Sequence, residues 1–119
     1  MFMTALVLFA IAAVGGITMA VLQFRGRTAP PVAIAVLHGL FAASALVVLL
    51  LAVINIGAGG AAGIALGLFV LAALGGFALL SFHLRGKALP GGLIVGHGVL
   101  AVAGFLVLLS AVFATAPSP

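Results

Sequence analysis

Two histidines, His38 and His97, are the side chains of this chain best suited to chemistry. Both lie within long apolar runs, and each stands seven residues beyond a proline, Pro31 or Pro90, that closes a basic segment. At the helical rise of about 1.5 Å per residue, each imidazole is expected about 10 Å inside a membrane-spanning helix. An ionisable side chain at that depth is a functional hypothesis by default, and imidazole is a neutral ligand for transition metals.

Composition restricts what else the chain can do. Of 119 residues, 67% are hydrophobic and 3% are charged, whereas about a quarter of the residues of a soluble domain are charged. The absence of Asp, Glu and Cys excludes carboxylate acid/base pairs, carboxylate metal sites and thiolate chemistry, so no enzyme is expected. The net charge of +4 comes from residues in short loops and does not indicate nucleic-acid binding.

The apolar runs predict an all-α integral membrane protein with four transmembrane helices. A helix needs about 20 apolar residues to cross the hydrocarbon core, and four runs are long enough. The predicted organisation is a first hairpin over 1–54 (spans 2–24 and 31–54), a turn over 55–60, a second hairpin over 61–113 (spans 61–84 and 89–113) and a tail over 114–119.

The two hairpins read as a tandem repeat that forms a four-helix bundle. The segment Arg25-Gly26-Arg27 matches Arg85-Gly86-Lys87 at an offset of 60 residues, and His38-Gly39 matches His97-Gly98 at an offset of 59. An even number of spans separates the copies, so both have the same orientation and the expected symmetry axis runs along the membrane normal.

The four cations predict the orientation of the bundle. Arg25, Arg27, Arg85 and Lys87 all fall in the two loops on one face, and the positive-inside rule places that face in the cytoplasm. Both termini are then periplasmic, and we expect a bacterial inner-membrane protein embedded in a lipid bilayer.

Paired glycines lie at the predicted depth of the histidines and suggest a cofactor site. Gly15-Gly16 and Gly75-Gly76 are nine or ten residues from the basic face, and Gly39 and Gly98 follow the histidines directly. The hypothesis is a b-type haem between the second and fourth spans, with one imidazole on each side of the iron and the glycines beside the macrocycle. Arg25, Arg27, Arg85 and Lys87 would hold the haem propionates. These features resemble the general plan of four-helix membrane cytochromes b in architecture and ligand placement, and imply electron transfer.

Other interpretations remain open at this point. The histidines can serve only to hydrogen-bond a neighbouring helix, with no cofactor, or they can belong to a quinone, chlorin or ion site. The small extramembrane mass favours an accessory subunit of a larger respiratory or photosynthetic assembly, or a homo-oligomer. The third histidine, His83, matches Gln23 in the repeat and is interpreted as a polar residue at the membrane interface.

Overall fold

The computed structural model describes residues 1–26, 29–57 and 59–114 and consists of four long helices. They are α1 (Phe2–Phe24), α2 (Val32–Ile56), α3 (Gly60–Leu84) and α4 (Gly91–Ala114). Each is long and apolar enough to cross a membrane. The structure confirms the predicted all-α fold with four apolar helices, which indicates an integral membrane protein.

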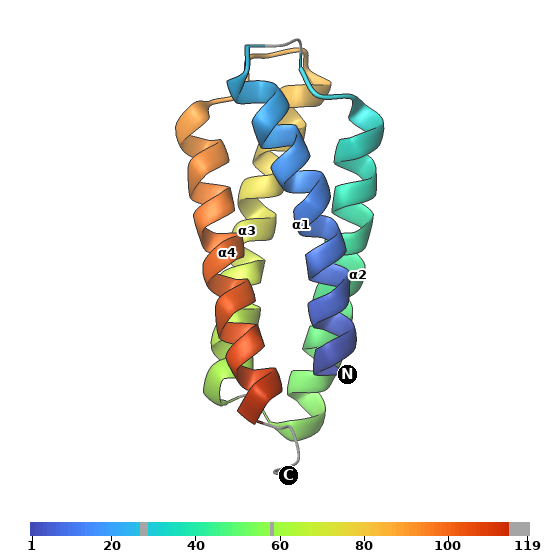
Figure 1. Cartoon of the computed structure of the whole chain (residues 1–119), viewed down its shortest axis with the longest axis vertical. Coiled ribbons are helices and arrows are strands. Elements are labelled where there is room, and N and C mark those ends of the chain that lie inside the picture. Colours follow the sequence, from blue (N-terminus) through green and yellow to red (C-terminus); the bar gives the residue numbers. More distant parts are fainter. Residues whose placement is uncertain (27–28, 58, 115–119) are drawn as a thin grey trace.

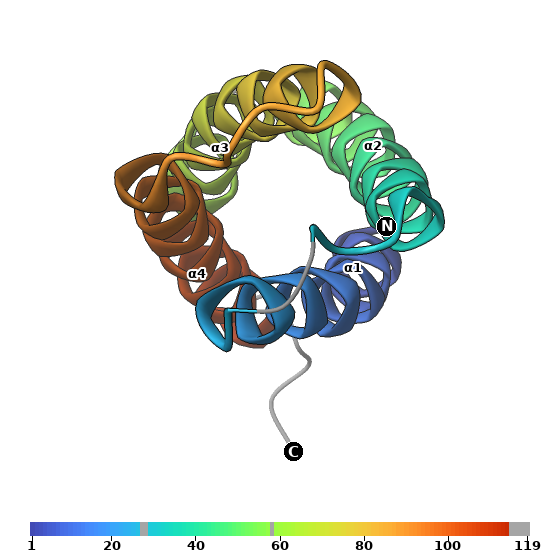
Figure 2. The ribbon, with the colours of Figure 1, turned by 90° about the horizontal axis from the view of Figure 1, so that it is seen from above.

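The helices form an antiparallel bundle about 49 Å long. Viewed along its axis, the bundle is a ring in which α1, α2, α3 and α4 follow one another in chain order (Figure 2). The closest pairs are α1 with α2 and α3 with α4, while α2 with α3 and α1 with α4 lie further apart, and the backbones of diagonal helices do not approach each other closely. The ends of α1 and α3 and the starts of α2 and α4 meet at one end, called the basic end below because Arg25, Arg85 and Lys87 lie there (Figure 1).

Glycine and proline set the helix boundaries at the basic end. After α3, the amide of Gly86 donates to the carbonyl of His83 and that of Lys87 donates to the carbonyl of Phe82. This pattern ends a helix through a residue in the left-handed region, and Gly86 has a φ of 63°. The loop after α1 uses Gly26 (φ 69°) in the same role.

At Pro31 and Pro90, the next two helices begin one or two residues later in the chain than the sequence predicted. Pro31 is extended, with ψ 131°, and caps α2, so the helix begins at Val32 rather than at residue 31. The carbonyl of Pro90 accepts hydrogen bonds from the amides of Leu93 and Ile94. Helix α4 therefore begins at Gly91 rather than at residue 89. At the other end, helical hydrogen bonding takes in Asn55, Ile56 and Gly60, which the sequence had assigned to the turn.

The packed core occupies only the half of the bundle away from the basic end. At its centre the rings of Phe9 and Phe69 stack in parallel, with centroids 3.6 Å apart. A Cβ at Gly104 would lie 3.3 Å from the Phe69 ring, so glycine there makes room for the stack. Every buried hydrophobic side chain in the described helices lies in this half: Ala5, Leu6, Phe9, Ala12, Ala45, Leu49, Ala52, Val53, Ala62, Ala65, Phe69, Ala72, Leu108, Ala111 and Val112.

Candidate two-histidine site

The structure brings His38 of α2 and His97 of α4 together across the diagonal of the bundle. The centroids of the two imidazole rings are 6.1 Å apart, and the ring planes are inclined at 78°. The backbones of α2 and α4 do not approach each other closely, so the two side chains themselves bridge the centre. Both rings are partly buried, and they lie where the packed core ends.

Each imidazole is oriented by a backbone carbonyl of the other helix in its own hairpin. Nδ1 of His38 lies 2.7 Å from the carbonyl oxygen of Ala12, and Nδ1 of His97 lies 2.7 Å from that of Ala72. A carbonyl can only accept, so Nδ1 carries the proton in both rings and Nε2 keeps its lone pair. Nε2 has no hydrogen bond to any described residue in either ring, and neither Nε2 atom is fully buried.

The paired glycines pack directly against the imidazoles. A Cβ added to Gly16 would lie 3.1 Å from Cε1 of His38, and one added to Gly15 would lie 3.3 Å from its Cβ. On α3, the corresponding distances from Gly76 and Gly75 to His97 are 3.2 and 3.5 Å. The expectation from the sequence was that these glycines would lie beside a cofactor. In the structure each pair contacts the histidine of its own hairpin, and so lets the two helices approach closely.

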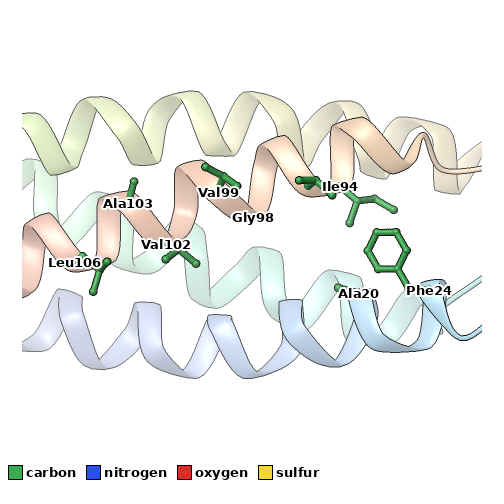
Figure 3. A pocket seen from close by; sticks show the side chains of 9 residues that line it. Ala20, Phe24, Ile94, Gly98, Val99, Val102, Ala103 and Leu106 are labelled. Carbon is green, nitrogen blue, oxygen red and sulfur yellow. The ribbon is translucent and has the colours of Figure 1, made fainter.

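Gly39 and Gly98, unlike the paired glycines, do not leave room for an imidazole. A Cβ at either position would meet nothing within 4 Å, and Gly39 is exposed. Gly98 instead lies in an apolar groove of about 520 Å³ between α1 and α4 (Figure 3). The groove is lined by Ala20, Phe24, Ile94, Val95, Gly98, Val99, Val102, Ala103 and Leu106.

The cations proposed from the sequence occupy different positions at the basic end. Arg25 is exposed at the end of α1, and Arg27 lies outside the described residues. Nε of Arg85 donates to the carbonyl of Ser81 at 3.1 Å, and its guanidinium lies 5.3 Å from the centroid of the Phe82 ring. Lys87 lines a cavity between the ends of α1 and α3.

Two residues of that cavity were not assigned to a site from the sequence. Gln23 and His83 both line it, and Oε1 of Gln23 is buried without a hydrogen-bond partner among the described residues. A signal was available in the repeat, since Gln23 and His83 occupy equivalent positions in the two hairpins. The sequence does not show that the ends of α1 and α3 line the same cavity, because this depends on how the helices pack.

The described residues contain no group of three or more His, Cys, Asp or Glu side chains placed to hold a metal ion. Comparison of the chain with protein-family models, curated proteins and solved structures finds no match.

Proposed function

We propose that the chain binds one b-type haem between His38 and His97 and acts in electron transfer within the membrane. The observation that carries the proposal is the spacing of the two rings. Metal–imidazole bonds are about 2 Å long, so a metal ion held in line between two imidazole nitrogens places the ring centroids about 6 Å apart. The centroids of His38 and His97 are 6.1 Å apart.

The hydrogen bonds of the imidazoles support the same interpretation. A histidine that ligates a metal commonly donates its other ring N–H to a backbone carbonyl, which fixes the tautomer and raises the basicity of the ligand nitrogen. Nδ1 of each ring has such a partner, in Ala12 and Ala72, while no described residue pairs with Nε2. Haem bound in this way would supply one-electron redox chemistry, and the chain's own part would be to hold and orient two neutral ligands.

The distribution of buried side chains is also consistent with a ligand on the basic side of the histidines. No hydrophobic side chain of the described helices is buried there, although the helices continue for about two further turns.

The proposal includes the predicted tandem repeat of the two hairpins. Two equivalent hairpins in the same orientation would place identical ligands on the two faces of one iron. The near-identical surroundings of the two histidines support this arrangement. We further propose that the basic end is cytoplasmic, because the cations Arg25, Arg85 and Lys87 lie there, and that the chain works as a subunit of a larger membrane complex.

Titration with haem tests the proposal. Detergent-solubilised apoprotein should take up one haem per chain and develop the absorbance of a low-spin haem. His38→Ala and His97→Ala should each remove or strongly alter that spectrum, since no carboxylate or thiolate in the chain can replace the lost ligand. Haem uptake unchanged by both substitutions would contradict the assignment of the ligands.

A structural role is the second candidate, and the hydrogen bonds themselves favour it. Interhelical hydrogen bonds and close approach through small residues hold helices together in lipid. The contacts of His38 with Ala12 and Gly16 provide both without any cofactor. In that case the protein would be a non-catalytic accessory subunit, and histidine substitutions would change stability in a protein that takes up no haem.

A further inference from the structure

A cavity of about 220 Å³ lies at the basic end, between the ends of α1 and α3. It is lined by Gln23 of α1, His83 of α3, and residues 86–89 of the loop between α3 and α4, with Ala29 from the other basic loop. Helices α1 and α3 are diagonal partners whose backbones do not approach each other closely (Figure 2), so a cavity lined by both lies across the centre of the bundle.

Helical register directs Gln23 and His83 toward the same interior as the two histidines. Gln23 follows Gly16 by seven residues, and His83 follows Gly76 by seven. Seven residues are nearly two full turns, so each polar side chain shares a helix face with the glycine that contacts an imidazole. The rise over seven residues is about 10 Å, which separates the cavity from the histidine level along the axis.

The cavity offers one buried hydrogen-bonding group that the described residues leave unsatisfied. Oε1 of Gln23 is buried without a partner among the described residues, and a buried polar atom without a partner is unfavourable. Rotation of the amide presents its NH2 group instead, so Gln23 can donate as well as accept. Lys87 adds an ammonium group and His83 an imidazole, and the chain contains no Asp or Glu to pair with them.

We propose that this cavity binds an anionic oxygen group, and that in the haem-loaded protein this group is a haem propionate. Lys87, His83 and Gln23 would donate to the carboxylate, which fixes the edge of the haem that faces the basic end. The inference rests on the proposed haem function and adds Gln23 and His83 to its site. The phosphate of a lipid headgroup has the same chemistry and is the other source of such an anion.

The test compares haem b with its dimethyl ester, in which both carboxylates are neutral. Apoprotein is titrated with each in nanodiscs of phosphatidylcholine. Wild type should bind haem about tenfold more tightly than the ester, as expected for a charge-assisted contact. Lys87→Ala should weaken the binding of haem but not of the ester, and so remove most of the preference for haem. His83→Ala should reduce the same preference by a smaller amount.

Arg85→Ala is the matched control. It removes the same charge from the same loop, but the guanidinium of Arg85 lies against Phe82 and does not line the cavity. The preference for haem should therefore survive in this variant. Equal binding of haem and ester by wild type, or equal losses in Lys87→Ala and Arg85→Ala, would overturn the propionate site while leaving the two-histidine haem intact. Binding of neither compound would instead refute the proposed function.

A second arm identifies the source of the anion. Wild type and both variants are released from nanodiscs containing phosphatidylglycerol, and the lipids that stay bound are counted by native mass spectrometry before and after haem is added. Phosphatidylglycerol that wild type retains and Lys87→Ala loses is taken to occupy the cavity. If the cavity binds a haem propionate, adding haem should displace this lipid from wild type. Retention that depends on Lys87 and persists in the haem-loaded protein would assign the cavity to a lipid phosphate and contradict the propionate.

Discussion

Gly16 and His38 are in such close contact that a Cβ on the glycine would lie 3.1 Å from Cε1 of the imidazole. The equivalent distance from Gly76 to His97 is 3.2 Å. Few real Cβ contacts are so short, so a Cβ on either glycine would require the imidazole to shift by a few tenths of an ångström, next to its hydrogen bond with the facing helix. The glycines therefore determine where the imidazoles lie.

Substitution of these glycines should disturb the site. Gly16→Ala and Gly76→Ala are each expected to lower the free energy of unfolding by about 1–3 kcal/mol, the usual cost of overpacking, and to shift the absorbance of the bound haem. Gly39→Ala is the control, because a Cβ there meets nothing within 4 Å. Chemical denaturation and the optical spectrum provide the two measurements. Equal effects of Gly16→Ala and Gly39→Ala would refute the contact.

The sequence predicted the spans and the pairing of His38 with His97, because both follow from local features. Hydropathy and loop residues define the helices, and a matched offset places the histidines at equal depth. The contact of each imidazole with glycines of its own hairpin was not predicted, since it depends on how far each helix rotates about its axis. Gln23 and His83 line the same cavity because α1 and α3 face each other across the bundle. No local sequence pattern predicts which helices face each other in this way.

The hydrogen bond from His38 to Ala12 should stabilise the apoprotein. His38→Phe keeps a ring of similar shape but removes the N–H donor, and the expected loss in the free energy of unfolding is about 1 kcal/mol, in the range of interhelical hydrogen bonds in membranes. His83→Phe is the comparison, because the His83 ring makes no side-chain hydrogen bond to the described residues. If His83→Phe destabilises the apoprotein as much as His38→Phe, the hydrogen bond to Ala12 contributes nothing measurable.

The restriction of the packed core to one half of the bundle predicts unequal effects of two phenylalanine substitutions on α3. Phe69 is buried and stacked on Phe9, so Phe69→Ala should cost about 3 kcal/mol or more through the cavity that it leaves. Phe77 is 67% exposed, and Phe77→Ala should change the free energy of unfolding by no more than about 0.5 kcal/mol. Both values come from reversible unfolding in mixed micelles. Similar costs for the two variants would contradict a core confined to the Phe69 half.

The orientation of the bundle can be tested independently of any cofactor. The basic end carries Arg25, Arg85 and Lys87, so it should lie in the cytoplasm, with the turn between α2 and α3 on the other side. Alkaline phosphatase inserted at Gly57 should be active and green fluorescent protein inserted there should be dark. The opposite result at Gly57 would reverse the orientation, and the proposed propionate end would then face the periplasm.

The central claim is that one iron is held by both His38 and His97, and electron paramagnetic resonance of the ferric, haem-loaded protein tests it most directly. Two neutral imidazole ligands predict a low-spin signal in wild type, because two strong nitrogen ligands complete the coordination of the iron. The signal should be replaced by a high-spin species in His38→Ala and in His97→Ala alike. A high-spin signal in wild type, or a low-spin signal that survives either substitution, would contradict a haem shared by these two histidines.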